Sequence, residues 1–248
     1  MTTQNLLENH RSIRKYSSKN IDQERLEKLL TAGIRASNTG NMQLYSIVVT
    51  QGEDEKKALA PAHFYQPMAT EAPLVLTICA DVNRFSIWCK ERKAEPGFDN
   101  FQSFITAAID AVIVAQNIVI SAEAMGMGAC YLGTTLYTAD KIIEILNLPR
   151  GVIPITTLTI GYPAETPELT ERLPLEAVVH YEKYNNYTPA KIDEYFEEKE
   201  SIEEYKEFIK QNNKETLAQV FTDVRYPKES SVKFSEVLLE TLKKQGFL

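Results

Sequence analysis

The stretch from residue 102 to residue 132, QSFITAAIDAVIVAQNIVISAEAMGMGACYL, contains the strongest structural signal in the chain. Its first part predicts a helix over residues 102–125, with apolar side chains around most of its circumference. Gly126 and Gly128 are expected to end this helix, since glycine accepts the left-handed backbone of a C-terminal cap. Residues 129–132 then predict a short strand. A helix that is apolar nearly all round must be enclosed, either within one chain or by a second subunit.

A membrane span is the competing interpretation of this apolar segment. Asp110, Gln116, Asn117 and Glu123 interrupt it. A span needs roughly 20 mostly apolar residues without such groups. We therefore expect a core helix and no membrane partner.

Helices and strands alternate along the rest of the chain, which predicts a mixed α and β class. A helix over 22–36 is expected to begin at an Asp22 cap. The run at 73–80 is apolar on both faces, as a central strand is. Further strands are predicted at 45–50, 152–160 and 177–181, and further helices at 3–9, 139–147, 191–215 and 231–245.

The composition changes after about residue 188, where a charged, amphipathic helical region begins. We expect one domain over residues 1–188. Residues 189–248 are expected to form a helical extension packed on that same domain.

Composition and charge exclude several classes of protein. Of the 248 residues, 44% are apolar and 25% are charged, which is the balance of a globular protein. The net charge of −7 opposes nucleic-acid binding, which requires a basic field. The odd set of Cys79, Cys89 and Cys130 predicts a reducing, cytoplasmic compartment, and the N-terminus lacks the apolar core of a secretory signal.

The familiar motifs of nucleophilic, metal and phosphate-loop chemistry are missing from the sequence. The three histidines lie far apart, so no metal site is expected. Gly126-Met127-Gly128 is similar to the start of a dinucleotide fingerprint, but it follows a helix rather than a strand. We therefore interpret it as a helix cap.

Two polar segments are candidates for ligand binding. The basic segment at 10–15, HRSIRK, places two guanidinium forks around Ser12, which suits a phosphate monoester; a solvated basic turn is the alternative. The segment 37–43, SNTGNMQ, offers amides that could bind the edge of a heterocycle, although the same residues favour turns.

These segments, in this order, resemble the nitroreductase family of flavin enzymes. The resemblance spans essentially the whole chain, and no single motif carries it. Its later segments resemble the oxygen-insensitive, NADPH-preferring branch. The ordered matches are at residues 10–14, 36–43, 122–133, 148–149, 161–164, 167–169, 172–174, 228–230 and 244–247.

The resemblance implies an α+β fold with a mixed sheet flanked by helices, built as an intertwined homodimer with FMN at the subunit interface. The second subunit would enclose the helix at 102–125. The positions that match FMN contacts are His10, Arg11, Ser12 and Arg14 (phosphate and ribityl), Asn38 and Thr39 (loop beside the flavin), Gln66 (ring), Tyr131, Leu132, Gly133 and Thr134 (backbone near the reactive face), and Arg172 (phosphate or pyrimidine edge).

The chain departs from this branch at two places. Thr170 stands where relatives have a lysine, which implies weaker FMN retention or a lower flavin potential. Ser231 stands where relatives have an arginine. Residues 200–215 also lack arginine, so that Lys206 or Lys210 would meet the 2′-phosphate of NADPH as point charges. The preference between NADPH and NADH therefore stays open.

The resemblance implies an FMN-dependent NAD(P)H oxidoreductase. It would pass a hydride through flavin N5 in a ping-pong cycle to nitroaromatics, quinones or free flavin. No catalytic side chain is expected, because the flavin carries the chemistry. Two alternatives remain: a reductase of the same fold with another acceptor, such as an azo or halogenated compound, and a flavin-binding store or redox sensor without turnover.

Overall fold

The computed structural model describes residues 2–248 and divides into two compact units. Unit 1 holds the chain up to Glu168 together with Phe234–Leu248, and unit 2 holds Leu169–Lys233. This division differs from the expected boundary at residue 188. The chain leaves the sheet after its last strand, and the C-terminal Leu242 and Phe247 return to the core of unit 1.

Unit 1 is built on a four-stranded sheet with the order β1-β2-β4-β3. All three pairs of neighbouring strands are antiparallel, so within residues 2–248 the strands form an antiparallel sheet and not the mixed sheet that the resemblance implies. In the part of the chain that the structure describes, parallel pairing is confined to an isolated bridge between Ser12 and Ala129. The strands are β1 (Tyr45–Thr50), β2 (Leu74–Asp81), β3 (Gly128–Leu132) and β4 (Val152–Gly161).

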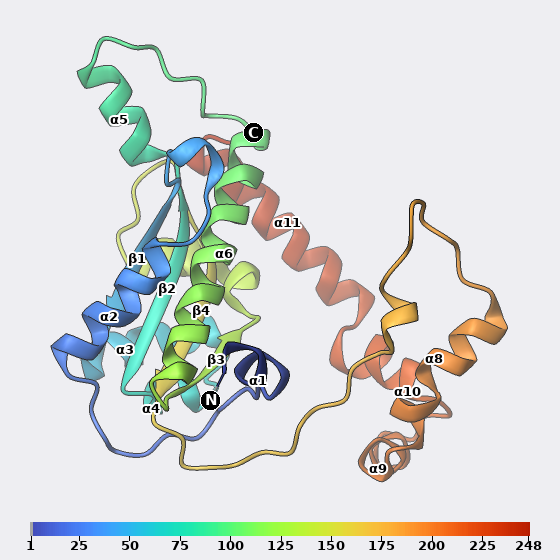
Figure 1. The fold of residues 1–248 in the computed structure, drawn as a ribbon. Helices are drawn as coiled ribbons and strands as arrows, with labels where there is room; N and C mark the ends of the chain where they lie inside the picture. Colours follow the sequence, from blue (N-terminus) through green and yellow to red (C-terminus); the bar gives the residue numbers. More distant parts are fainter. Residues whose placement is uncertain (1) are drawn as a thin grey trace. The chain divides into compact units, whose positions relative to one another are not determined.

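Two helices cover one face of this sheet, α2 (Gln23–Ile34) and α6 (Phe101–Ala124), as Figure 1 shows. Side chains alternate across a strand, and β2 is buried along its whole length, as expected of a central strand. Its residues Leu74, Leu76 and Ile78 join the larger core beneath α2 and α6.

The opposite face of the sheet carries a smaller apolar cluster and a row of hydroxyl groups. Val75 packs there with Leu59 and Ile142. Thr157 and Thr159 of β4 are fully buried and bond to side chains that approach this face. The elements on this side include α3 (Glu53–Leu59), η2 (Ala60–His63), α4 (Met68–Glu71), η3 (Thr135–Thr138) and α7 (Ala139–Ile145).

The long apolar helix is confirmed as α6, with an Asn100 cap at its start. It is the one helix within residues 2–248 that is long and apolar enough to cross a membrane, and half of that window is buried inside the chain. Its buried side packs on the sheet, as in a core helix. Its other side exposes an apolar stripe, in which Ile105, Ile109 and Val112 are 42%, 53% and 48% exposed. One chain therefore does not enclose it.

Gly126 follows α6 with φ +75°, and the Met127 N–H donates to Ala122 O at 2.9 Å. This geometry confirms the helix cap and excludes a dinucleotide fingerprint, in which the glycines must open a helix. The Asp22 cap of α2 is also confirmed, since its carboxylate accepts the Arg25 N–H at 2.8 Å.

Two sequence predictions are wrong, and both lie in unit 2. The expected strand at 177–181 is instead a short turn, η4 (Leu175–Ala177), followed by loop. The N–H groups of Val178 and Val179 bond back to Leu175 O at 3.0 and 2.8 Å, and all four strands of the sheet belong to unit 1. A β-branched run does not form a strand when no neighbouring strand is available to pair with it.

The expected single helix over 191–215 is two helices, α8 (Pro189–Ser201) and α9 (Glu203–Gln211). Ile202 between them has an extended backbone with ψ 126°, which interrupts the ladder of hydrogen bonds. The remaining elements are α1 (Thr3–Glu8), η1 (Thr39–Asn41), α5 (Asn83–Glu91), α10 (Leu217–Gln219), η5 (Val220–Arg225) and α11 (Lys228–Gln245).

Candidate functional site

The basic N-terminal segment, residues 10–16, lies against the beginning of β3. Ser12 forms the parallel bridge to Ala129, and the Ile13 N–H donates to Ala129 O at 3.0 Å. Gly128 permits this approach, because a Cβ there would lie 2.3 Å from Ile13 Cγ1. The contact brings together two predicted FMN-binding groups, residues 10–14 and 131–134, from distant parts of the sequence.

Hydrogen bonds fix the backbone of this segment from both sides. The buried Tyr16 hydroxyl lies 2.6 Å from Ile13 O and 2.8 Å from Thr159 Oγ1. Burial raises the pKa of this tyrosine far above its ordinary value. The Glu165 carboxylate accepts the backbone N–H groups of Arg14 and Lys15 at 2.7 and 3.1 Å. These bonds lower the pKa of Glu165, so the carboxylate stays charged at neutral pH.

The side chains of the segment differ in how their charges are balanced. His10 Nδ1 lies 2.5 Å from a carboxylate oxygen of Glu123 on α6. Within residues 2–248, neither Arg11 nor Arg14 forms an ion pair with a carboxylate. Arg11 Nε is buried with no hydrogen-bond partner. Two guanidinium groups are thus available to an anion, and a hollow of about 330 Å³ lies beside Arg11 and Glu123.

The loop that carries Asn38 and Thr39 is fastened to α6 by Asp110. This buried carboxylate accepts the Thr39 N–H at 2.9 Å, the Thr39 hydroxyl at 3.1 Å and the Leu44 N–H at 3.4 Å. In the sequence, Asp110 stands out only as an interruption of an apolar helix. A carboxylate in the middle of such a helix is the signal that a polar loop must be held there.

The same loop holds several left-handed residues. Gly40, Asn41 and Gln43 have φ of +58°, +56° and +54°. The Arg84 guanidinium donates to Gln43 O and, at 3.1 Å, to Tyr45 O. Asn38 Oδ1 accepts the Gln43 N–H at 3.2 Å. Glycine and asparagine adopt this conformation readily, whereas at Gln43 the local hydrogen bonds hold a backbone conformation that is uncommon for glutamine.

Gln66 and Thr134 are joined through His63. The fully buried imidazole places Nδ1 3.0 Å from Thr134 Oγ1, and the Gln66 N–H donates to His63 O at 3.1 Å. Among the described residues, neither His63 Nε2 nor Gln66 Oε1, both buried, has a hydrogen-bond partner. Burial lowers the pKa of His63 to about 4, so its ring is neutral at pH 7. His63 lies in no recognised motif, so no role is expected for it from the sequence.

The strand end at 131–134 presents backbone rather than reactive side chains. The Tyr131 hydroxyl donates to Gln116 Oε1 at 3.1 Å, and burial raises the pKa of this tyrosine to about 12. Leu132 is buried, and its carbonyl accepts the Thr135 hydroxyl at 2.9 Å. A side chain at the exposed Gly133 would meet nothing within 4 Å, so the backbone there is open.

The other predicted residues belong to unit 2. Arg172 Nη1 donates to the carbonyls of Thr170 and Glu171 at 3.1 and 2.9 Å. Lys206 and Lys210 lie on α9, where their Nζ atoms are 3.6 Å from Glu203 and 3.8 Å from Glu207. The cations of α9 are therefore balanced by carboxylates of their own helix. Ser231 is exposed on α11.

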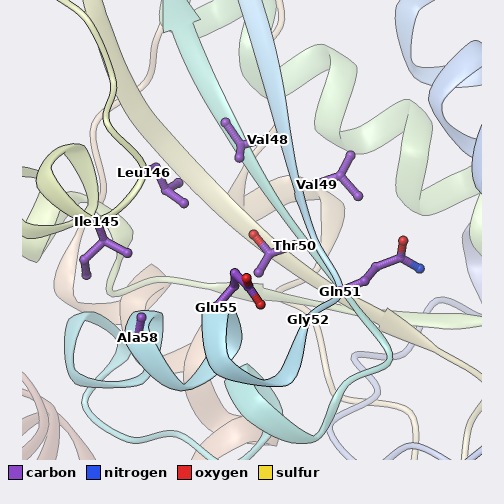
Figure 2. A pocket seen from close by; sticks show the side chains of 9 residues that line it. All are labelled: Val48, Val49, Thr50, Gln51, Gly52, Glu55, Ala58, Ile145 and Leu146. Carbon is purple, nitrogen blue, oxygen red and sulfur yellow. The ribbon is translucent and has the colours of Figure 1, made fainter.

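Another hollow in unit 1, of about 510 Å³, lies away from all the predicted residues. It lies beside β1, α3 and the end of α7. Figure 2 shows Ala58, Ile145 and Leu146 on one side of this hollow and Thr50 and Glu55 on the other. Within the described part of the chain, no group of three His, Cys, Asp or Glu side chains is arranged to hold a metal ion.

A model of the nitroreductase family matches residues 7–162. The chain belongs to the nitroreductase family. This nitroreductase-family chain is 32% identical over 252 residues to an FMN reductase [NAD(P)H] of Bacillus subtilis, with 97% of this chain and 96% of the relative covered.

Two solved structures extend the likeness of this nitroreductase-family chain over its full length. A protein from Bacteroides fragilis has a TM-score of 0.97 and 51% identity, covering 98% of this chain and 99% of that one. An NADPH:FMN oxidoreductase from Vibrio harveyi, complexed with NAD+, has a TM-score of 0.80 and 25% identity, covering 99% and 98%. The α+β fold expected of a nitroreductase is confirmed.

Proposed function

We propose that this protein is an FMN-dependent oxidoreductase that takes electrons from NADPH or NADH. Its acceptors would be nitroaromatics, quinones or free flavin. The observation that carries the proposal is the pair of guanidinium groups, Arg11 and Arg14, held without carboxylate partners on a segment docked against β3. The FMN reductase and NADPH:FMN oxidoreductase among its relatives support it.

The residues present fit FMN. A phosphate dianion is suited to two guanidinium forks with the Ser12 hydroxyl between them. Arg11 Nη1 donates to Asn9 O at 3.0 Å, and its other N–H groups could still bind an anion. His10, oriented by Glu123, would contribute to the same phosphate and ribityl end. Gln66 Oε1, buried without a partner, is an acceptor suited to the ring N–H of a flavin. Asn38, Thr39 and the backbone of 131–134 would border the ring.

When bound, FMN would supply hydride acceptance at N5 and two-electron transfer to an acceptor in a ping-pong cycle. The chain binds and orients it. Asp110 fixes the loop at Asn38 and Thr39, while Tyr16 and Glu165 fix the segment at Arg11 and Arg14. Arg172 is proposed, on the resemblance alone, as a donor near the flavin edge that becomes negative on reduction. Thr170 offers no positive charge there.

Lys206 and Lys210 are proposed contacts for the 2′-phosphate of NADPH. Each is exposed and lies within 4 Å of a glutamate on its own helix, which reduces the field available to a phosphate. We therefore expect only a small preference for NADPH over NADH.

We further propose a cytoplasmic homodimer without nucleic-acid or membrane partners. The exposed apolar stripe on α6, formed by Ile105, Ile109 and Val112, supports an interface with a second copy. A second subunit would enclose the remaining apolar face of this helix.

A flavin-binding store or redox sensor is a second candidate, favoured by Thr170 in place of a cation. A reductase of the same fold that uses azo or halogenated acceptors is a third. A panel of acceptors separates the third candidate from the first.

The test begins with protein purified without added flavin, whose absorption spectrum is then recorded. NADPH or NADH is added in the absence of oxygen. We expect flavin bands that bleach with either donor. Bands that persist with both would indicate the store or sensor. A colourless protein that does not take up FMN would overturn the proposal.

A further inference from the structure

Loop 38–44 lies between α2 and β1, and one carboxylate holds both of its ends. Asp110 Oδ1 accepts the N–H and the hydroxyl of Thr39, while its Oδ2 accepts the Leu44 N–H at 3.4 Å. Asp110 and Leu44 are each 1% exposed, whereas Asn41 in the middle of the loop is exposed. The ends of the loop are therefore fixed to buried groups of unit 1, and its middle presents polar groups to solvent.

A second charged side chain, Arg84 at the start of α5, holds the last part of this loop. Its guanidinium donates to Gln43 O and, at 3.1 Å, to Tyr45 O. Its Nη1 also donates to Ser46 Oγ at 3.3 Å. The planar guanidinium fork reaches several acceptors at once, which a single ammonium group does not do in the same geometry. Arg84 thus joins the end of the loop to the first residues of β1.

Arg84 is itself oriented by Asp81, the last residue of β2. The Asp81 carboxylate accepts the Arg84 N–H at 3.1 Å and the Ser46 hydroxyl, and it lies 4.0 Å from Arg84 Nη1. The Asp81 N–H donates to Leu44 O at 2.9 Å. Because Asp81 is only 6% exposed, these bonds fasten Arg84 and the end of the loop to the central strand of the sheet.

The backbone that Arg84 holds is in a conformation uncommon for glutamine. Gln43 has φ +54°, and its N–H donates to Asn38 Oδ1 at 3.2 Å. The orientation of Asn38, which is proposed to border the flavin ring, therefore depends on the backbone at Gln43. Strained residues persist where the surroundings over-determine them, and they cluster at ligand sites.

We propose that Arg84 is a positioning residue for the ring end of the flavin, acting through Gln43 and Asn38. In the FMN-dependent enzyme proposed above, on which this role rests, Arg14 would bind the phosphate, whereas Arg84 holds the loop beside the ring. A loop that is fixed before binding loses less entropy when the ligand binds. Arg84 should therefore strengthen the binding of a flavin equally with or without its phosphate.

The test compares Arg84→Met and Arg84→Lys with the wild type, by calorimetric titration of each apoprotein with FMN and with riboflavin. Methionine removes the donors, while lysine keeps a charge without the planar fork. The Arg84 side chain is 54% exposed, so its replacement leaves no cavity in the core. Arg92→Met is the control, because Arg92 is an exposed arginine that directly follows the same helix and whose Nη1 donates to Glu91 O at 3.4 Å.

Arg84→Met is expected to raise the Kd for FMN and the Kd for riboflavin by the same factor, about three- to tenfold, since Asp110 still holds both ends of the loop. Arg84→Lys should show a smaller increase, and Arg92→Met none. Hydrogen exchange of the apoproteins gives a readout without ligand. The N–H groups of Gln43 and Tyr45 should exchange faster in Arg84→Met, while those of β2 exchange as in the wild type, which separates a local effect from a loss of global stability.

A Kd that rises for FMN and stays constant for riboflavin would mean that Arg84 acts on the phosphate, and would overturn the proposal. Unchanged Kd values for both flavins, unchanged exchange at Gln43 and Tyr45, or an equal loss in Arg92→Met would overturn it too. If the wild type binds neither flavin, the proposed function fails and the role of Arg84 fails with it. If the wild type binds both and the Arg84 variants bind equally well, the role of Arg84 alone fails.

Discussion

The segment at residues 10–16 and helix α9 both carry two cations close together, but they treat the charges in opposite ways. On α9, Lys206 and Lys210 each lie within 4 Å of a glutamate three residues before them. On the N-terminal segment, neither Arg11 nor Arg14 forms an ion pair with a carboxylate among residues 2–248, and Arg11 Nε is buried. The number of cations in a segment is therefore a poor predictor of anion binding, because pairing with nearby carboxylates decides which charges remain free.

The two regions also differ in how they are held. Helices α8 and α9 contain no buried residue. Residues 10–16 are fixed by a bridge to β3, by the buried Tyr16 hydroxyl and by Glu165. Because a pre-organised site loses less entropy on binding, changes in the N-terminal segment should have the larger effects.

Among the changes proposed for the two regions, Arg14→Ala in the N-terminal segment should have the largest effect, which is on the affinity for FMN. Loss of a charge-assisted contact to phosphate costs about 2–3 kcal/mol, or a roughly 30- to 150-fold weaker FMN complex. Gel filtration followed by absorption spectroscopy should show protein without flavin. Arg92→Ala, at an exposed arginine on a different loop, is the control and should keep its flavin. Full FMN stoichiometry in Arg14→Ala would remove Arg14 from the phosphate site.

The next prediction concerns the pH dependence of stability, through the buried His63 and its hydrogen bond to Thr134. Burial lowers the pKa of His63 to about 4, below the ordinary value near 6.5. Between these two pKa values the unfolded chain binds the proton and the folded chain does not, so protonation favours unfolding. The contribution of His63 to the free energy of unfolding is therefore complete above pH 6.5 and is lost as the pH falls toward 4. The loss reaches about 3 kcal/mol. Melting temperatures of the wild type should fall across that interval more steeply than those of His63→Gln. Parallel curves for the two proteins would show that His63 does not carry this pH dependence.

A smaller effect is expected from restoring a cation in unit 2. Thr170→Lys should tighten FMN binding by about 1 kcal/mol, or roughly fivefold, because an exposed cation contributes at the lower end of the range for charged hydrogen bonds. Fluorescence titration of the apoprotein with FMN measures it. Thr170→Gln, of similar length without charge, is the control, and an equal gain in that variant would exclude an electrostatic cause.

The smallest effect should appear in α9. Since each lysine is exposed and already paired, Lys206→Ala combined with Lys210→Ala should raise KM for NADPH only about three- to fivefold and leave KM for NADH unchanged. Lys28→Ala, which removes a similar exposed lysine–glutamate pair on α2, is the control. A loss shared equally by NADPH and NADH would mean that these lysines do not recognise the 2′-phosphate.

Much of the sheet and its flanking helices was predictable, because their patterns are local. The apolar run of β2 and the periodicity of α6 each specify their element without knowledge of neighbours. Val178 and Val179 show the limit of this reasoning, since a β-branched run forms a strand only beside a partner strand. The break at Ile202 was likewise hidden, because helical spacing continues across it.

The candidate site was predictable in its residue types and not in its supports. Arg11 and Arg14 are recognisable from spacing and chemistry. Asp110 and His63 act through contacts across 71 positions of sequence, to Thr39 and Thr134, and such contacts leave no local pattern. The strained conformation of Phe64 and Tyr65 is equally invisible in the sequence, because neither residue type favours positive φ.

The central claim is that residues 10–16, docked on β3, hold the phosphate of FMN. Calorimetric titration of the apoprotein with FMN and with riboflavin, which lacks the phosphate, tests it most directly. If residues 10–16 hold the phosphate, FMN should bind to the wild type at least tenfold more tightly than riboflavin, and Arg14→Ala should remove most of this difference. Equal affinity of the wild type for FMN and riboflavin would contradict it.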